Sequence, residues 1–397
     1  MKPGVMGLIA LLASTAVAGS ACAQVGAQGD ALDRRVSAVG DGQVELHFDA
    51  RADVCGDGTS WYRMGGDNWY GTYTQFSDGP SRGECTAGPV RVLATLIGRE
   101  VVRLQMFVGP LQHRTDATDL GAVPDREAAA WLLSLGQRLD GRAARDAIAA
   151  AVLAKDGAGA DGFLRVARDE DRSRETRRSA LSALGRINSD AGVPALLQLA
   201  DRRDDAWLAT EATRALGRSK DPRARAWART VVSDAKRSDE QRAAAIATLG
   251  SDPVSGADAA LLRESYRGFS TQRQKEAVLS AIASIGGRTN AEWLMRVASD
   301  ENELPTVRRR AVSMAERAGA SGVALSTLYD RVTDTETRGA VITALSQEGS
   351  RPAREKLMTI AKSTETPTTR RRAIAALEKF DSAEVNELLT SLALPRP

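Results

Sequence analysis

The sequence predicts a mainly α-helical chain in which an α–α superhelix follows a small, disulfide-linked antiparallel β domain. Three observations favour this fold class. An apolar phrase returns about every 32 residues through the last two-thirds of the chain, strand-like alternation occupies part of the first hundred residues, and two cysteines flank a glycine-rich and aromatic-rich stretch. A fixed period of this length is typical of stacked helical repeats.

The repeated phrase is defined by its last apolar position, which we call the anchor. The positions three, four and seven residues before each anchor share one stripe of a helix with it, and a second apolar stretch follows each anchor. We therefore expect each repeat to be a first helix, which carries the anchor, followed by a second helix. The anchors are Leu184, Leu216, Leu249, Ile282, Ala315, Leu345 and Leu377.

Proline in the first turn marks the start of several of these helices. Phrases such as residues 177–185 and 305–312 resemble HEAT repeats, and more narrowly the short variety named after phycobilisome lyases. The resemblance covers about residues 125–397. It implies a HEAT-like solenoid, but this family serves many functions and the resemblance does not choose among them.

The N-terminal part has the alternation of half-buried strands. Val44, Leu46 and Phe48 alternate with polar residues, and residues 90–97 and 101–108 read as a hairpin. The stretch before the first helix is polar. We therefore divide the chain into a signal peptide over residues 1–23, a small β-rich domain over 24–111, a linker over 112–123 and a HEAT-like helical repeat array over 124–397.

The first residues have the pattern of an export signal. Lys2 precedes a short apolar run over residues 5–18, and Ala21 and Ala23 match the small residues of a cleavage site. The run is shorter than the roughly 20 residues that span a bilayer. We expect cleavage after Ala23 and a periplasmic or extracellular protein without a membrane span.

The cysteines fit the same interpretation. An alternative to plain cleavage is a lipid anchor on Cys22, as in bacterial lipoproteins. We favour plain cleavage, because Gly19 occupies the position where a lipoprotein signal has a larger aliphatic residue. After cleavage two cysteines remain, and in an oxidising compartment Cys55 and Cys85 would form one disulfide.

Composition argues against several function classes. The formal net charge is +3 and the chain has two histidines. Near-neutral charge gives no general attraction for nucleic acid, and so few histidines do not support a catalytic triad or a catalytic zinc site. We therefore assign no catalytic residue, no metal and no cofactor.

A basic residue stands seven positions before most anchors, and we call these residues the ladder. One interpretation is a phosphate-tracking stripe. The other, which we favour, is structural: each head group binds a turn carbonyl or an acid of the preceding repeat, such as Asp171, Glu303, Asp334 or Glu365. The resemblance to HEAT repeats implies such a clasp as well. The ladder consists of Arg177, Arg242, Lys275, Arg308, Arg338 and Arg370.

Aromatic residues are the candidate contact residues, because exposed tryptophan and tyrosine often form binding hot spots. The alternative for each is an ordinary packed side chain. Trp61, Trp69 and Tyr70 belong to the β domain. Trp227, Tyr266, Trp293 and Tyr329 fall on second helices, which in HEAT-like arrays line the concave surface.

These features favour an interaction scaffold that holds a protein or peptide partner on the concave face of the array. One alternative is binding of glycans or the cell wall through the aromatic N-terminal domain. Another is a lyase, by family analogy, or a carbohydrate-active enzyme that uses paired carboxylates. The acids in question are Asp49, Asp53, Asp57, Asp67 and Asp78.

Overall fold

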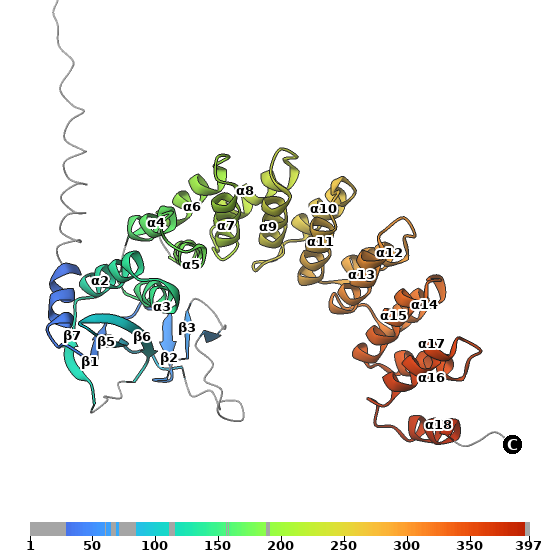
Figure 1. Cartoon of the computed structure of the whole chain (residues 1–397). Coiled ribbons are helices and arrows are strands. Elements are labelled where there is room, and N and C mark those ends of the chain that lie inside the picture. Colours follow the sequence, from blue (N-terminus) through green and yellow to red (C-terminus); the bar gives the residue numbers. More distant parts are fainter. Residues whose placement is uncertain are drawn as a thin grey trace, which may run out of the picture. The chain divides into compact units, whose positions relative to one another are not determined.

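The computed structural model describes residues 29–59, 61–64, 69–70, 85–110, 116–155, 157, 159–187 and 191–393 (Figure 1). The chain divides into two compact units, Met1–Leu196 and Leu197–Pro397. The expected signal peptide over residues 1–23 lies outside the described residues, as does Cys22. In the part of the chain that is described, no helix is long and apolar enough to cross a membrane.

A four-stranded sheet forms the base of the first unit. Its strands are β1 (Gly42–Phe48), β5 (Val90–Ile97), β6 (Glu100–Val108) and β7 (Thr118–Ala122), in the order β6-β5-β1-β7. The expected hairpin is confirmed as the antiparallel pair of β5 and β6. Strand β1 pairs antiparallel with β5 and parallel with β7.

Strand β7 corrects part of the expected linker over residues 112–123. Thr118 pairs with Val44, and Ala122 pairs with His47, so the end of that stretch belongs to the sheet. Leu120 is the only large apolar residue of β7, and none of the five residues is fully buried at this edge of the sheet. An edge strand of this kind lacks the apolar alternation by which strands are recognised.

A smaller three-stranded sheet carries the disulfide. Strands β2 (Val54–Gly56), β3 (Tyr62–Met64) and β4 (Trp69–Tyr70) pair antiparallel in chain order. Cys55 of β2 is bonded to Cys85, as expected from the sequence, with 5.3 Å between the two Cα atoms.

A helix over residues 29–37 and four later helices complete the described part of the first unit, together with the beginning of α6 (Gly192–Asp201). Helix α3 packs on β6, and α3 and α5 contact each other. The division between the units therefore falls inside α6, after several helices, and not in the stretch before the first helix. The four are α2 (Asp125–Arg138), α3 (Gly141–Ala151), α4 (Ala160–Arg168) and α5 (Arg174–Leu184).

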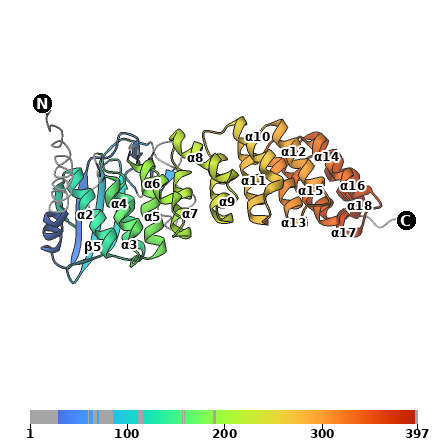
Figure 2. The same ribbon diagram turned by 90° about the horizontal axis from the view of Figure 1, so that it is seen from above.

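The second unit is a row of helices, which Figure 2 shows in chain order. Every expected anchor lies at or near the end of a helix and is 1% exposed or less. The helices are α7 (Ala206–Leu216), α8 (Pro222–Ser233), α9 (Asp239–Leu249), α10 (Gly256–Ser265), α11 (Gln272–Ile285), α12 (Arg288–Ser299), α13 (Pro305–Arg317), α14 (Gly322–Arg331), α15 (Thr335–Glu348), α16 (Arg351–Lys362), α17 (Pro367–Leu377) and α18 (Ala383–Ala393). The helical repeat architecture is confirmed.

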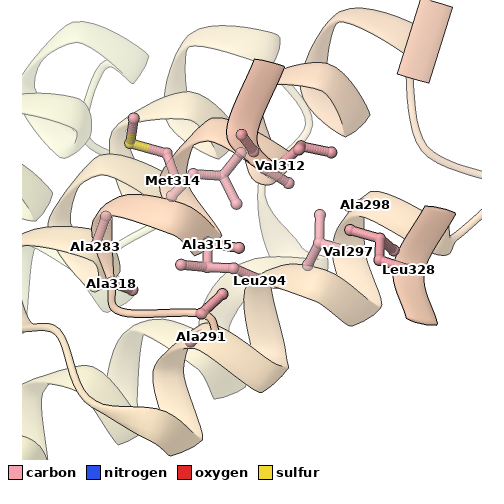
Figure 3. Close-up of a cluster of buried hydrophobic side chains, with 14 of the residues drawn as sticks. Ala283, Ala291, Leu294, Val297, Ala298, Val312, Met314, Ala315, Ala318 and Leu328 are labelled. Carbon is pink, nitrogen blue, oxygen red and sulfur yellow. The ribbon is translucent and has the colours of Figure 1, made fainter. Parts of the chain in front are cut away.

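The repeats share one core. A single cluster of buried apolar side chains extends from α8 to α18, and Figure 3 shows Leu294 of α12 close to Ala315 of α13. Alanine is its commonest residue, and the alanines four before the anchors, such as Ala245 and Ala311, have no exposed surface. Small residues allow the helix axes to come close together, so the neighbouring repeats can cover one another's apolar sides.

The phase of the repeat differs from the expected one. Within unit 2, consecutive helices pack most extensively as α8 with α9, α12 with α13 and α16 with α17. Each hairpin is therefore a second helix followed by a first helix, not the reverse. A periodic pattern gives the spacing of repeats, but it does not say which of two connecting turns lies inside a hairpin.

The two layers of unit 2 are packed differently. Successive first helices, from α7 through α9, α11, α13 and α15 to α17, contact one another directly, whereas successive second helices make few contacts or none until α14 and α16. The layer with closer neighbours is the inner side of a bent row, as Figure 1 shows for α11, α13 and α15. The inner layer is therefore made of first helices, not of the second helices expected from the family resemblance.

Overpacking the alanine contact should weaken the stack. We predict that Ala245→Phe lowers the free energy of unfolding by about 1–3 kcal/mol or more, because Ala245 is fully buried in α9. The matched control is Ala247→Phe in the same helix, at an exposed position, which should change it by no more than about 0.5 kcal/mol. Urea unfolding monitored by circular dichroism measures both, and equal effects would refute this packing.

Candidate functional site

The ladder residues lie at the turn of each hairpin. The guanidinium groups donate to the carbonyl of a residue at the end of the preceding second helix, where carbonyls have no partner within their own helix and a positive charge is favourable. The bonds are Arg177 Nε to Ala167 O at 3.0 Å, Arg242 Nη2 to Val232 O at 3.0 Å, Arg308 Nε to Ala298 O at 3.2 Å, Arg338 Nε to Val332 O at 2.8 Å and Arg370 Nε to Ala361 O at 3.2 Å.

The acids pair with the ladder in a different order from the one expected. Glu303, Asp334 and Glu365 were expected to bind the basic residue that follows each of them. Each instead binds the ladder residue of the hairpin before its own. The pairs are Lys275 with Glu303 at 2.8 Å, Arg308 with Asp334 at 2.8 Å and Arg338 with Glu365 at 2.9 Å.

The ladder thus has two contacts with different roles. The carbonyl bond closes a turn within one hairpin, and the ion pair joins that hairpin to the next. In the α9 hairpin an aromatic ring replaces the acid, because the guanidinium carbon of Arg242 lies 4.7 Å from the centre of the Phe269 ring. This geometry corresponds to the structural interpretation. Arg177 and Arg308 are 8% and 7% exposed and present little surface to a phosphate backbone.

Asp334 also caps helix α15. Its Oδ1 accepts the N–H of Thr337 at 2.7 Å. Burial alone would raise the pKa of the Asp334 carboxyl, but the hydrogen bond from the Thr337 N–H and the charge of Arg308 outweigh it and lower the pKa below its ordinary value. The carboxylate therefore stays ionised and able to pair with Arg308 at neutral pH.

The two tyrosines proposed as contacts are buried against the ladder. Tyr266 and Tyr329 are 5% and 4% exposed. The Nζ of Lys275 lies 5.4 Å from the Tyr266 ring centre, and the guanidinium carbon of Arg338 lies 5.2 Å from that of Tyr329. Burial, and then Glu365, raise the pKa of Tyr329 to about 12. These rings belong to the packing of the repeats.

The five tryptophan and tyrosine candidates that remain are half-buried or have side chains outside the described residues. Trp227 and Trp293 are half-buried against the shared core. The ring of Trp293 also contacts that of Tyr266 in an edge-to-face arrangement, with 5.0 Å between the ring centres. Trp61 is also half-buried. The side chains of Trp69 and Tyr70 lie outside the described residues.

The acids of the N-terminal domain do not come together in a site among the described residues. Asp53 is paired with Arg51, at 3.0 Å. No group of three or more histidine, cysteine, aspartate or glutamate side chains is placed to hold a metal ion in the ranges that the structure describes. Asp67 and Asp78 lie outside those ranges.

A hollow of about 470 Å³ opens on the first helices α13, α15 and α17. We call it the first-helix hollow. It lies on the side of these helices that carries no anchor, and small side chains such as Thr343 and Ala375, two positions before the anchors, form its floor. Its lining includes four charged residues and several small ones, among them Arg309, Glu336, Gly339, Thr343, Arg372, Ala375 and Lys379.

Sequence reasoning missed this hollow, although a signal was available. Two positions before the anchors, five consecutive first helices carry a small residue: Ala247, Ser280, Ser313, Thr343 and Ala375. The sequence analysis concentrated on large aromatic residues. A surface that admits another chain can instead be marked by a row of small ones.

Other hollows are comparable in size. One of about 520 Å³ lies between α12 and α14 and includes Arg296 and Arg331. One of about 530 Å³ lies in the first unit and includes Arg51 and Phe163. Neither is lined by several first helices, so the first-helix hollow is the candidate that follows the repeat.

Removing a ladder head group should destabilise the array. We predict that Arg308→Met lowers the free energy of unfolding by about 1–3 kcal/mol, because it leaves the Ala298 carbonyl without a donor and Asp334 without its cation. The control is Arg310→Met on the exposed surface of the same helix, for which about 0.5 kcal/mol or less is expected. Chemical denaturation compares the two, and no loss in the Arg308 variant would contradict the clasp.

Comparison with known proteins gives a family match in the array. Residues 160–250 match the family HEAT_2, described as HEAT repeats. A search of curated proteins found no match. The matched segment begins in α4 and ends after α9, where the hairpins described above lie.

Three solved structures are similar at low identity. Human deoxyhypusine hydroxylase in complex with glycerol is 19% identical, over 60% of this chain and 90% of that one, with a TM-score of 0.26. The complex of CpcE and CpcF of phycocyanin lyase from Nostoc sp. PCC7120 is 19% identical, over 59% and 95%, with a TM-score of 0.34. Lipovitellin is 11% identical, over 75% and 40%, with a TM-score of 0.40. Values this low say nothing about activity. The family match is the firmer finding, and the helical part of the chain is a HEAT-like array.

Proposed function

We propose that this chain is an exported scaffold that holds a protein or peptide partner on the first-helix face of unit 2. The observation that carries the proposal is the composition of that face. Two members of its row of small residues, Thr343 and Ala375, line a hollow that is formed by residues of α13, α15 and α17 and by Lys379. Stacked repeats commonly use such an inner surface for binding.

The ladder residues and the two buried tyrosines support the same proposal, because their contacts within the array leave them little surface for a partner. The ladder is engaged with turn carbonyls and acids, and Tyr266 and Tyr329 are buried beside it. These groups are needed for the stack. A partner would therefore be recognised by the residues that face away from the core on the first helices.

A photo-crosslinker can locate the partner's surface. We predict that p-benzoylphenylalanine at Thr343 captures a discrete partner in extract of the producing cells, because Thr343 lies in the hollow. Thr359 on α16 is the matched control, since it is also exposed and its hydroxyl donates to the carbonyl four residues earlier in the same way. Adducts at Thr359 alone, or at neither position, would contradict a first-helix binding face.

Export is supported by the disulfide between Cys55 and Cys85, because such bonds persist mainly in oxidising compartments. We predict that the mature protein begins at Gln24, and N-terminal sequencing of protein from the extracytoplasmic fraction checks this. Recovery of the chain from the cytoplasm with residues 1–23 still attached would contradict export. A lipid-modified N-terminal Cys22 would replace plain cleavage by anchoring.

A further inference from the structure

We propose that the first-helix hollow binds an acidic peptide segment that carries small or aliphatic side chains. This inference rests on the proposed function and names the chemistry of the partner. Its basis is the combination of shape and charge at one place: an uncharged floor of small residues, bordered by more cations than acids.

The floor has room for a peptide chain. Ala340, Thr343 and Ala375 place only short side chains on the surface, and Ile342, which also lines the hollow, is only 2% exposed. The hollow is open and extends across three neighbouring helices. An extended segment with modest apolar side chains fits such a floor, whereas a bulky aromatic ligand has no deep slot to enter.

The border is basic. Arg309, Arg372 and Lys379 face one acid, Glu336, so the lining carries a formal charge of +3 − 1 = +2. Among the described residues, no carboxylate lies within 4.0 Å of the charged groups of Arg309 or Lys379. Cations without a protein partner are available to a ligand, and complementary charge favours carboxylates.

Arg372 is held in place in this border. Its Nη2 donates to Glu336 at 3.2 Å and its Nη1 to the carbonyl of Thr335 at 3.3 Å. The guanidinium lies over Gly339 so closely that a Cβ atom there would be 2.2 Å from Nη1. A glycine inside a helix is less favourable than alanine. The glycine at this position therefore makes room for the arginine head group.

Gly339→Ala is consequently an informative variant. The added methyl group must displace the Arg372 head group, which is the flexible end of a long side chain, while the helix itself gains from the substitution. Thermal unfolding should show a fold at least as stable as that of the unchanged protein. The variant thus moves one cation without removing it and without weakening the array.

The test measures anisotropy of a fluorescein-labelled peptide, acetyl-EEALEEALEE-amide, with the full mature chain. We expect saturable binding that weakens with salt, and loss of binding by the peptide in which every glutamate is glutamine. Arg372→Gln and Lys379→Gln should each weaken binding about fivefold, and Gly339→Ala should weaken it by a similar factor. The matched control, Arg296→Gln in the hollow between α12 and α14, should have no effect.

Each other outcome counts against the proposal. Equal binding of the glutamate and glutamine peptides, no effect of Arg372→Gln, or a loss confined to Arg296→Gln would overturn it. Tighter binding of a single-stranded DNA oligomer of equal charge, abolished by the same variants, would assign the hollow to nucleic acid. Capture of a protein at Thr343 without acidic-peptide binding would refute this inference while the scaffold proposal stands.

Discussion

The array depends on one constraint: a pair of helices cannot bury its apolar side without a neighbouring pair. This constraint explains why alanine recurs beside the anchors and why successive first helices lie so close together. At Gly250 the approach leaves no room for a side chain, since a Cβ atom would lie 2.6 Å from the Cα of Ala281 in the next first helix. The close layer becomes the inner side of unit 2, and its outward positions become the candidate binding face.

The ladder follows from the same requirement. Hairpins that stack through small residues still need their turns fixed, and the guanidinium groups do this by binding the last carbonyls of the second helices. Their remaining donors reach an acid of the next hairpin, as in the pairs of Arg308 with Asp334 and Arg338 with Glu365. Cations that make no such contact among the described residues, such as Lys379, lie on the first-helix face. Position within the repeat therefore separates the structural cations from those that a partner can use.

The sequence predicted the periodic part of the fold well and the rest less well, for physical reasons. Anchors are defined by burial, so their spacing gives the helices directly. The phase of the hairpins, the inner layer and the acid partner of each ladder residue depend on which helices pack together, and period alone does not contain that information. Strand β7 escaped notice because an exposed edge strand has no apolar alternation. The hollow escaped notice because it is formed by small residues such as Thr343, whose meaning appears only when neighbouring helices are placed side by side.

Amide hydrogen exchange of the full chain carrying Gly250→Val tests the central constraint most directly. Gly250 has a helical backbone, with φ of −85°, so valine introduces no left-handed strain and acts through its contact with Ala281. If each pair is stabilised by its neighbours, exchange will rise most in α9 and α11 and less with each repeat further along the row. A uniform rise that includes β1 and β5 would contradict the account, because it would mean that the chain opens as one cooperative body.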